Sequence, residues 1–288
     1  MNKGRTLERT YKVSKAKLPI SNGAQKILRW HNNILLMAVE FAVLAMFVQF
    51  AVSHCFNFDI WYMLATGREI LANGIPYENV FAQQEGMQII VQQWFLCIVN
   101  YVIYSQFGFA GLAWWICAMT IVLMVSLYRL GRLKKRDKFG AEIILALMIP
   151  VLYCMSSYIT LCSSIYSMIA YCWVVFFCEK YRQTSQYRWL AFIIPLAIVH
   201  SSFHMSLAIF DVVIVGCYWI PDFLKPLHAR GRLKKVSFTE SSYKRWPVLI
   251  AMVATALALC VNPYGIRGAL YVLLSYGAAD YANVIPEM

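Results

Sequence analysis

Long apolar runs, separated by shorter polar segments, form the dominant pattern along the 288 residues of the chain. A helix that crosses a membrane needs about 20 successive apolar residues, because the hydrocarbon core of a bilayer is about 30 Å thick. By this criterion the pattern predicts an all-α fold, a polytopic transmembrane helix bundle of about seven spans. The expected spans cover residues 33–53, 109–129, 139–157, 161–178, 189–203, 204–221 and 246–261.

One further apolar run, residues 88–105, is interrupted by three glutamines and Asn100. If this run crossed the membrane, the basic stretch Arg129–Lys138 would lie outside, although basic loops normally stay in the cytoplasm. We therefore expect residues 88–105 to form a juxtamembrane helix, with its amide face in water and its aliphatic face in lipid.

Basic residues gather in four segments that flank the apolar runs, and this places all four segments in the cytoplasm. The segments are Lys3–Arg29, Arg129–Lys138, Lys180–Arg188 and Lys225–Arg245. The loop 54–108 has the reverse charge balance, with four acidic side chains against the single cation Arg68. These acids are Asp59, Glu69, Glu78 and Glu85. We therefore expect this loop to lie on the outer side of the membrane.

Composition agrees with a chain that has lipid as its solvent, since 60% of the residues are apolar and 14% are charged, with a mean hydropathy of +0.57. Soluble domains carry about 25% charged residues. The net charge of +12 does not indicate nucleic-acid binding, because the cations flank apolar runs, where they orient helices. The nine cysteines show no spacing typical of a metal site. No nucleic-acid partner and no metal site are therefore predicted.

These patterns divide the chain into four parts. Residues 1–32 are expected to form a basic cytoplasmic tail, 33–53 the first transmembrane helix, 54–108 an outer loop with two juxtamembrane helices, and 109–288 the rest of the transmembrane bundle. The prediction is a multi-pass protein of a bacterial cell membrane with its N-terminus in the cytoplasm.

The outer loop opens with apolar residues at helical spacing from Ile60 to Leu71, and the pair Asn73–Gly74 ends the pattern. This predicts an amphipathic helix over residues 60–73 on the outer surface, with Asp59 at or just before its N-terminus. Two compatible roles are open for Asp59. Its carboxylate can cap the helix by accepting backbone N–H bonds, or it can do chemistry.

Four short motifs follow one another along the chain. Residues Asp59–Asn79 match D-x-W-x-x-L-x-x-G-x-x-I-x-x-x-G-x-P-x-x-N, and QQWF follows at Gln92–Phe95, VHSSFHMSL at Val199–Leu207 and NPYG at Asn262–Gly265. In these motifs the chain resembles the GT-C class of polytopic membrane glycosyltransferases, which includes bacterial relatives of protein mannosyltransferases and aminoarabinose transferases. It differs from them at LCSSIYS, Leu161–Ser167, where such relatives often carry Arg-Pro. It also ends before their last helices, as a truncated member would.

The resemblance implies an enzyme that transfers a sugar from a polyprenyl-phosphate donor to an extracytoplasmic glycan or protein acceptor. Inverting transfer needs a carboxylate to take the proton of the acceptor hydroxyl, and cationic or hydrogen-bonding groups to stabilise the departing phosphate. Asp59 is the expected catalytic base. The expected substrate-binding residues are Arg68, His54, His200, His204, Trp61, Gln93, Trp94, Asn262 and Arg267.

The two histidines of VHSSFHMSL are four residues apart, which puts both rings on one face if the turn is helical. Packing between helices, contact with substrate or phosphate, and metal binding stay open as roles for His200 and His204. Two ligands do not complete a metal site, so no resident cofactor is predicted, and a divalent metal remains an alternative. Trp61 and Trp94 either stack on a sugar or anchor the chain at the membrane interface.

Two other classes of function compete with the enzyme. A noncatalytic membrane subunit is the alternative if the last helices of the GT-C relatives, which this sequence lacks, would have completed the groove for the sugar donor. A transporter or flippase of lipid-linked saccharide is favoured by Glu40 and Asp211, which are acids inside predicted spans. Carriers of this kind commonly show an internal repeat, and this sequence shows none, whereas the acidic outer loop favours the enzyme. Membrane lipid is an expected partner in every case.

Overall fold

The structure, a computed structural model, describes residues 59–83, 86–133, 158–220 and 243–275, with single positions between 34 and 46 and between 144 and 154. Two compact units, Met1–Ala42 and Val43–Met288, divide the chain, and every helix named below belongs to the second unit. The predicted tail 1–32 and the predicted spans 33–53 and 139–157 lie outside the fully described ranges.

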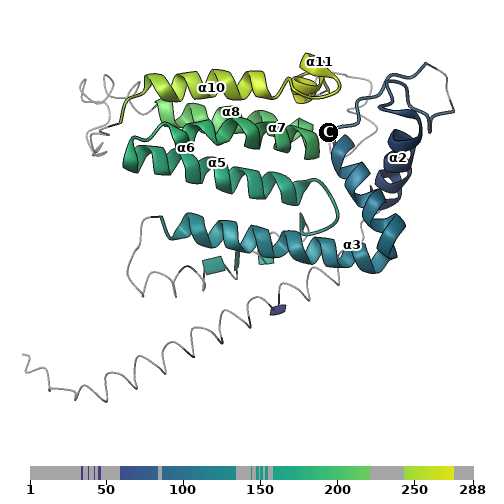
Figure 1. The fold of residues 1–288 in the computed structure, drawn as a ribbon, viewed down its shortest axis with the longest axis horizontal. Helices are drawn as coiled ribbons and strands as arrows, with labels where there is room; N and C mark the ends of the chain where they lie inside the picture. The colour runs from purple at the N-terminus through teal and green to yellow at the C-terminus, as the bar shows by residue number, and fades with distance from the viewer. Residues whose placement is uncertain are drawn as a thin grey trace, which may run out of the picture. The chain divides into compact units, whose positions relative to one another are not determined.

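All regular elements in the described ranges are helices, which confirms the all-α prediction (Figure 1). They are α2 (Asp59–Asn73), α3 (Trp94–Gly131), α5 (Ser164–Thr184), α6 (Arg188–Ala191), α7 (Ile193–Phe203), α8 (Met205–Trp219), α10 (Trp246–Ala258), α11 (Gly265–Ala269) and α12 (Tyr271–Ser275). In this part of the chain, β-structure is limited to one isolated bridge between Glu78 and Gln88.

Each predicted span that falls in the described ranges coincides with helix: the second part of α3, α5, α6 with α7, α8, and α10. Within those ranges one helix, α3, is long and apolar enough by length and composition to cross a membrane. The shorter apolar helices are Arg188–Phe203, Met205–Trp219 and Trp246–Ala258.

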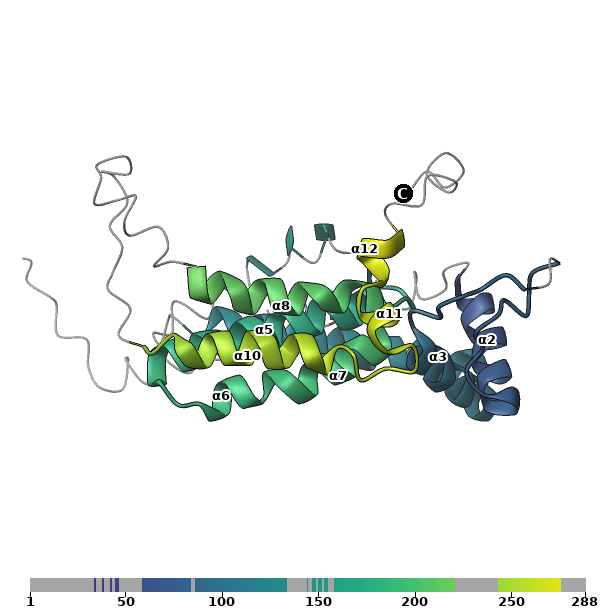
Figure 2. The same cartoon turned by 90° about the horizontal axis from the view of Figure 1, so that it is seen from above.

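Helices α5, α7, α8 and α10 run side by side and form a bundle (Figures 1 and 2). One apolar cluster joins all four, because Val174 of α5, Ile193 of α7, Val215 of α8 and Val248 of α10 are buried against one another. This cluster removes apolar side chains from the surface and gives the bundle a rigid interior.

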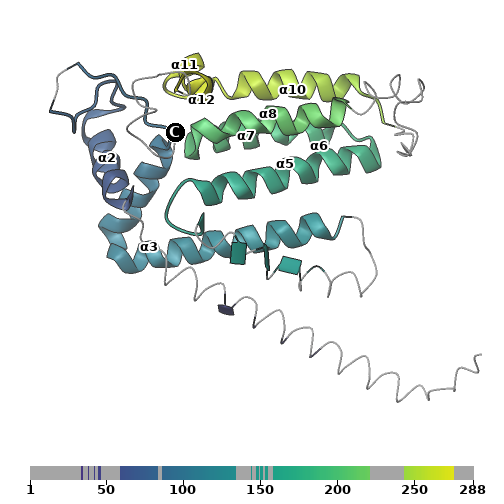
Figure 3. The ribbon, with the colours of Figure 1, turned by 180° about the vertical axis from the view of Figure 1, so that it is seen from behind.

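A sharp bend at Gly108 divides α3 into two parts, residues 94–107 and residues 109–131 (Figure 3). Gly108 has φ 63° and ψ −156°, a backbone conformation that is essentially limited to glycine. The first part pairs with α2, and the second part packs along α5. As a result α2 and the first part of α3 form a helical hairpin that lies across one end of the bundle (Figure 1).

The prediction of a helix over residues 60–73 is confirmed, since α2 spans Asp59–Asn73. Its apolar face is buried against α3, with Ile60, Met63 and Leu64 almost fully covered. The helix ends before Gly74, whose φ of +90° is the left-handed conformation that commonly stops a helix. The spacing of apolar residues, together with the stop signal Asn73–Gly74, therefore located this helix.

The predicted helix over residues 88–105 is wrong at its start, because the helix begins at Trp94. Residues 87–91 are not helical and pair with the preceding loop: Ile89 N–H donates to the carbonyl oxygen of Tyr77 at 3.0 Å, and Asn79 N–H donates to that of Met87 at 2.7 Å. These bonds satisfy backbone groups that a helix would have satisfied otherwise. The amide-rich segment is thus a strand-like loop leading into α3.

The end of the bundle away from α2 is rich in cations. At the end away from α2, Tyr181 donates a hydrogen bond to the carbonyl oxygen of Lys244 at 2.6 Å, and Gln183 donates to that of Leu133 at 3.4 Å. This joins the C-terminal ends of α3 and α5 to the start of α10, in a region where cations outnumber acids. The described cations of these segments are Arg129, Arg132, Lys180, Arg182, Arg188, Lys244 and Arg245.

Candidate functional site

Three segments far apart in the sequence meet at the end of the bundle that carries α2. Met205 N–H donates to the carbonyl oxygen of Gln92 at 2.9 Å, which ties the break between α7 and α8 to the loop before α3. Tyr264 donates to the carbonyl oxygen of Pro76 at 2.8 Å and accepts from Val91 N–H at 3.2 Å. The turns singled out in the sequence therefore share one end of the bundle.

The tyrosine of NPYG is the centre of this junction. Burial raises the pKa of the Tyr264 hydroxyl above its usual value, while the hydrogen bond from Val91 N–H lowers it. The hydroxyl stays protonated near neutral pH, because tyrosine normally ionises only near pH 10. It can therefore donate to Pro76 and accept from Val91 at the same time.

Asn262 holds the turn that presents Tyr264. Its side-chain nitrogen donates to the carbonyl oxygens of Leu259 at 2.7 Å and Gly265 at 2.9 Å, and its side-chain oxygen accepts from Tyr264 N–H at 2.8 Å. The amide is thus committed to the turn. Both N–H donors of the side chain are used within the turn, and its role as a substrate ligand stays a prediction.

A buried polar network lies in the bundle beneath this junction. His200 Nδ1 is 2.8 Å from Asp211 Oδ2, and His200 Nε2 is 2.9 Å from Ser167 Oγ. The same Ser167 Oγ is 2.7 Å from His204 Nδ1. The exposed fraction is 9% for His204, 2% for His200, 1% for Ser167 and 0% for Asp211. The network joins α5, α7 and α8 through side chains that are all at least nine-tenths buried, and His204 keeps the most contact with solvent.

The expectation that one helical face carries both histidines needs correction. His200 belongs to α7, whereas His204 has φ −153° and ψ 80° and lies at the break between α7 and α8. The rings converge because both bind Ser167 of α5. Sequence reasoning noted LCSSIYS only for its missing Arg-Pro and overlooked Ser167, since a serine in an apolar run carries no signal of its own. Contact of the histidines with a substrate stays a prediction.

The predicted catalytic base lies at the opposite edge of the helical hairpin from this network. Asp59 is exposed and is the first residue of α2. Two residues later, the ring of Trp61 is 61% exposed and contacts Phe109 edge-on at a centroid distance of 5.6 Å. Asp59 therefore lies close to the bend of α3, and the structure does not bring it together with His200.

The remaining predicted residues have varied surroundings. Arg68 and Arg267 are exposed, on α2 and α11 respectively. Trp94 is half-buried in the apolar cluster between α2 and α3, so it packs within the protein. Gln93 immediately precedes α3, and His54 lies outside the described residues.

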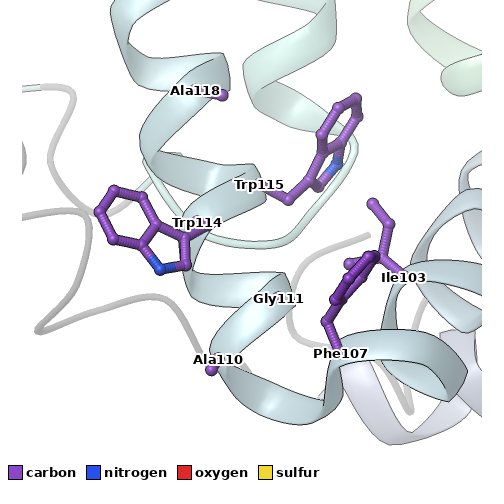
Figure 4. A pocket seen from close by; sticks show the side chains of 7 residues that line it. All are labelled: Ile103, Phe107, Ala110, Gly111, Trp114, Trp115 and Ala118. Atoms are coloured by element: carbon purple, nitrogen blue, oxygen red, sulfur yellow. The ribbon is translucent and has the colours of Figure 1, made fainter.

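An apolar groove of ≈ 510 Å³ follows the bend of α3. Figure 4 shows its side chains, with Trp114 and Trp115 directed to different sides of the helix. The lining residues are Ile103, Phe107, Ala110, Gly111, Trp114, Trp115 and Ala118. A groove of this size and character suits a hydrocarbon chain and has few groups that could bind a polar ligand.

Trp115 connects the groove to the polar network. Its indole N–H donates to the hydroxyl of Tyr166 at 2.7 Å, and the Tyr166 ring stacks on Phe203 at a centroid distance of 4.7 Å. Tyr166 precedes Ser167 on α5, and Phe203 precedes His204. Two side-chain contacts thus connect the groove to the chain neighbours of Ser167 and His204.

The described residues contain no group of three or more His, Cys, Asp or Glu side chains that could hold a metal ion. His200 and His204 share a serine instead of facing a common empty position. Metal binding by the histidine pair therefore has no support from this arrangement.

Replacing Tyr264 by Phe is expected to lower the free energy of unfolding by about 1–3 kcal/mol, because the Val91 amide and the Pro76 carbonyl lose their partner. Hydrogen exchange over residues 87–93 should become faster in the same variant. Tyr77→Phe is the matched control, since the Tyr77 hydroxyl donates to the Pro263 carbonyl at 3.2 Å from an exposed position. Equal effects of the two substitutions would contradict a central role for Tyr264.

Comparison of the chain with protein-family models, with curated proteins and with solved structures gave no match.

Proposed function

We propose that the protein is a multi-pass membrane glycosyltransferase of the GT-C type, which transfers a sugar from a polyprenyl-phosphate donor to an extracytoplasmic glycan or protein. The observation that carries this proposal is the placement of an exposed acid at the start of α2, next to the bend of α3. Trp61 of α2 contacts Phe109, and the residues on both sides of Phe109 along α3 line the apolar groove. The transfer requires a carboxylate and a place for a lipid chain, and in this proposal both are provided near the bend of α3.

The dimensions and charges of the bundle support a membrane location. Helix α5 has 21 residues and is therefore about 31 Å long at 1.5 Å per residue, which matches the thickness of a bilayer core. Cations cluster at the end away from α2, whereas Asp59, Glu69 and Glu78 lie on α2 and the loop after it. Since basic segments stay in the cytoplasm, α2 would lie on the outer side, with the N-terminus inside.

The helical hairpin of α2 and residues 94–107 supports the juxtamembrane assignment. A helix that lies across the end of a spanning bundle runs along the membrane interface. Exposed aromatic side chains gather there, as expected for residues that sit at the level of the lipid head groups. They are Trp61, Tyr62, Tyr77, Phe81, Phe95 and Phe107.

In the proposed reaction, the Asp59 carboxylate takes the proton of an acceptor hydroxyl as its oxygen attacks the anomeric carbon of the sugar. The bond between the anomeric carbon and the phosphate oxygen breaks, and the electron pair leaves with the polyprenyl phosphate. Arg68, the exposed cation on the same helix as Asp59, is assigned to the phosphate in this proposal. The groove at the bend of α3 would hold part of the polyprenyl chain.

The experiment compares wild type with Asp59→Asn in lipid vesicles that contain polyprenyl-phosphate sugars and an acceptor. Removing a general base typically costs 10²- to 10⁴-fold in rate, so we expect a loss of about that size. Glu69→Gln is the matched control, because Glu69 is an acid on the same helix whose carboxylate accepts from Asn73 at 2.6 Å. Equal turnover by Asp59→Asn and wild type would eliminate Asp59 as the base.

A further inference from the structure

The hydrogen bonds among Ser167, His200, His204 and Asp211 form one continuous chain with three links. The distances are 2.7 Å between His204 Nδ1 and Ser167 Oγ, 2.9 Å between Ser167 Oγ and His200 Nε2, and 2.8 Å between His200 Nδ1 and Asp211 Oδ2. Each link is short enough for direct proton transfer along a hydrogen bond. The chain has no gap that would need another group.

With Asp211 ionised, two proton arrangements satisfy every link. A carboxylate only accepts, so His200 Nδ1–H donates to Asp211 when Asp211 is ionised. With neutral His200, Ser167 then donates to His200 Nε2 and accepts from His204 Nδ1–H. With His200 protonated on both nitrogens, His200 donates to Ser167, and Ser167 donates to His204 Nδ1. The second arrangement holds one more proton and keeps all three bonds.

We propose that His204, Ser167 and His200 form a proton relay that carries one proton from the loop end of the bundle into its core, where the charge rests on His200 beside Asp211. The proton enters at His204 Nε2, and the Nδ1 proton of His204 moves to Ser167 Oγ. The original hydroxyl proton of Ser167 moves to His200 Nε2. His204 ends neutral with its proton on the other nitrogen, Ser167 ends as a hydroxyl, and His200 ends as an imidazolium.

Burial sets the direction of the relay. His204 is the most exposed member and lies in the break before α8, where Met205 N–H binds the Gln92 carbonyl. Ser167 and Asp211 are almost completely enclosed. Protons therefore reach the network from the end of the bundle where α2 and the turn of Tyr264 lie. The same burial excludes Ser167 as a nucleophile, since a substrate has no access to its oxygen.

The surroundings of Asp211 favour a positive charge on His200. Asp211 Oδ1 accepts no hydrogen bond within the described part of the chain, and an ionised carboxylate buried without sufficient partners is costly. A neighbouring imidazolium offsets part of that cost. The positive charge on His200 thus lies directly beside the buried Asp211 carboxylate.

Within the described part of the chain, the titratable groups on the elements packed around the relay are as follows. On α3 and α6, which pack on α7, they are Cys97, Tyr101, Tyr104, Cys117, Tyr128, Arg129 and Arg188. Tyr171 of α5 contacts the His200 ring edge-on at 5.4 Å, and its hydroxyl donates to the Leu207 carbonyl at 2.8 Å, so it is committed elsewhere. Helix α10, which packs on α7 and α8, has no titratable side chain. On α11 and α12, which pack on α8, the titratable residues are Arg267 and Tyr271.

The test is nitrogen-resolved NMR of the full chain with ¹⁵N-labelled histidine in lipid nanodiscs, with signals assigned by single substitutions. On acidification of wild type, we expect His200 to lose its unprotonated nitrogen signal while His204 stays neutral and moves its proton from Nδ1 to Nε2. Both changes should share one midpoint. Separate midpoints for the two rings, or a His204 that keeps its tautomer, would overturn the relay.

Substitutions at Ser167 test the central link. Ser167→Ala should abolish the coupled change, so that His200 keeps its unprotonated nitrogen, whereas Ser167→Thr keeps a hydroxyl and should restore coupling. Ser201→Ala is the matched control, because Ser201 is equally buried and its hydroxyl donates to the Ile198 carbonyl at 3.0 Å, outside the relay. Coupling that persists in folded Ser167→Ala would refute the proposal. If Ser167→Ala does not fold, the midpoints of the His200 and His204 changes in wild type are enough to test the relay. No sugar donor is used, so the result is independent of the proposed transferase activity.

Discussion

His200→Leu is expected to lower the free energy of unfolding by about 1–3 kcal/mol, the usual cost of leaving a buried hydrogen-bonding group without its partner. Asp211 is 0% exposed and would keep no hydrogen-bond partner on either carboxylate oxygen among the described residues. Ser167 would keep only His204 as its partner. The measurement is equilibrium unfolding of the purified protein in mixed detergent micelles.

A second variant separates the cost of an unpaired carboxylate from the cost of altered packing. In His200→Leu/Asp211→Val both polar groups are replaced by apolar side chains, and such replacements are often close to neutral. We therefore expect the double variant to recover most of the stability that His200→Leu loses. If the double variant loses as much stability as His200→Leu and Asp211→Val lose together, the two side chains are not coupled. The unpaired Asp211 carboxylate is then not the cause of the instability of His200→Leu.

Gly67→Ala is expected to lower the free energy of unfolding by about 3 kcal/mol, at the upper end of the cost of overpacking. A Cβ at position 67 would overlap the carbonyl oxygen and carbon of Cys97 and the Cβ of Tyr101. Two of these are backbone atoms of α3, which cannot move aside by a change of side-chain rotamer. The substitution should therefore push α2 away from α3 and open the helical hairpin.

Cys97 provides a direct readout of this opening, because its side chain is 0% exposed beneath α2. Alkylation of Cys97, followed by mass spectrometry of the peptide that contains it, should be faster in Gly67→Ala than in wild type. Ala72→Val is the matched control, since Ala72 is an exposed residue of the same helix. Unchanged alkylation and stability in Gly67→Ala would show that the contact of α2 with Cys97 is not tight.

Much of the fold was predictable because it depends on local periodicity. The apolar spacing from Ile60 to Leu71 located α2 to within one residue of its start, since a helix between water and an apolar partner needs one apolar face. The long apolar runs likewise coincide with α3 after its bend, α5, α7, α8 and α10. The start of α3 was missed, because the segment before Trp94 pairs with residues 77–79 through backbone bonds that have no side-chain signal.

The candidate site was predictable only in part. The order of residues alone indicates that helices form, which residues can carry charge or protons, and that the motifs at Asp59, His200 and Asn262 are polar positions beside apolar runs. The folded chain was needed to see that His200 binds Asp211 and shares Ser167 with His204, and that the Asn262 amide bonds within its own turn. The physical reason is that periodicity is a property of neighbours along the chain, whereas hydrogen-bond partners in a bundle depend on how helices rotate and slide against one another. That arrangement is set by the packing of many side chains at once.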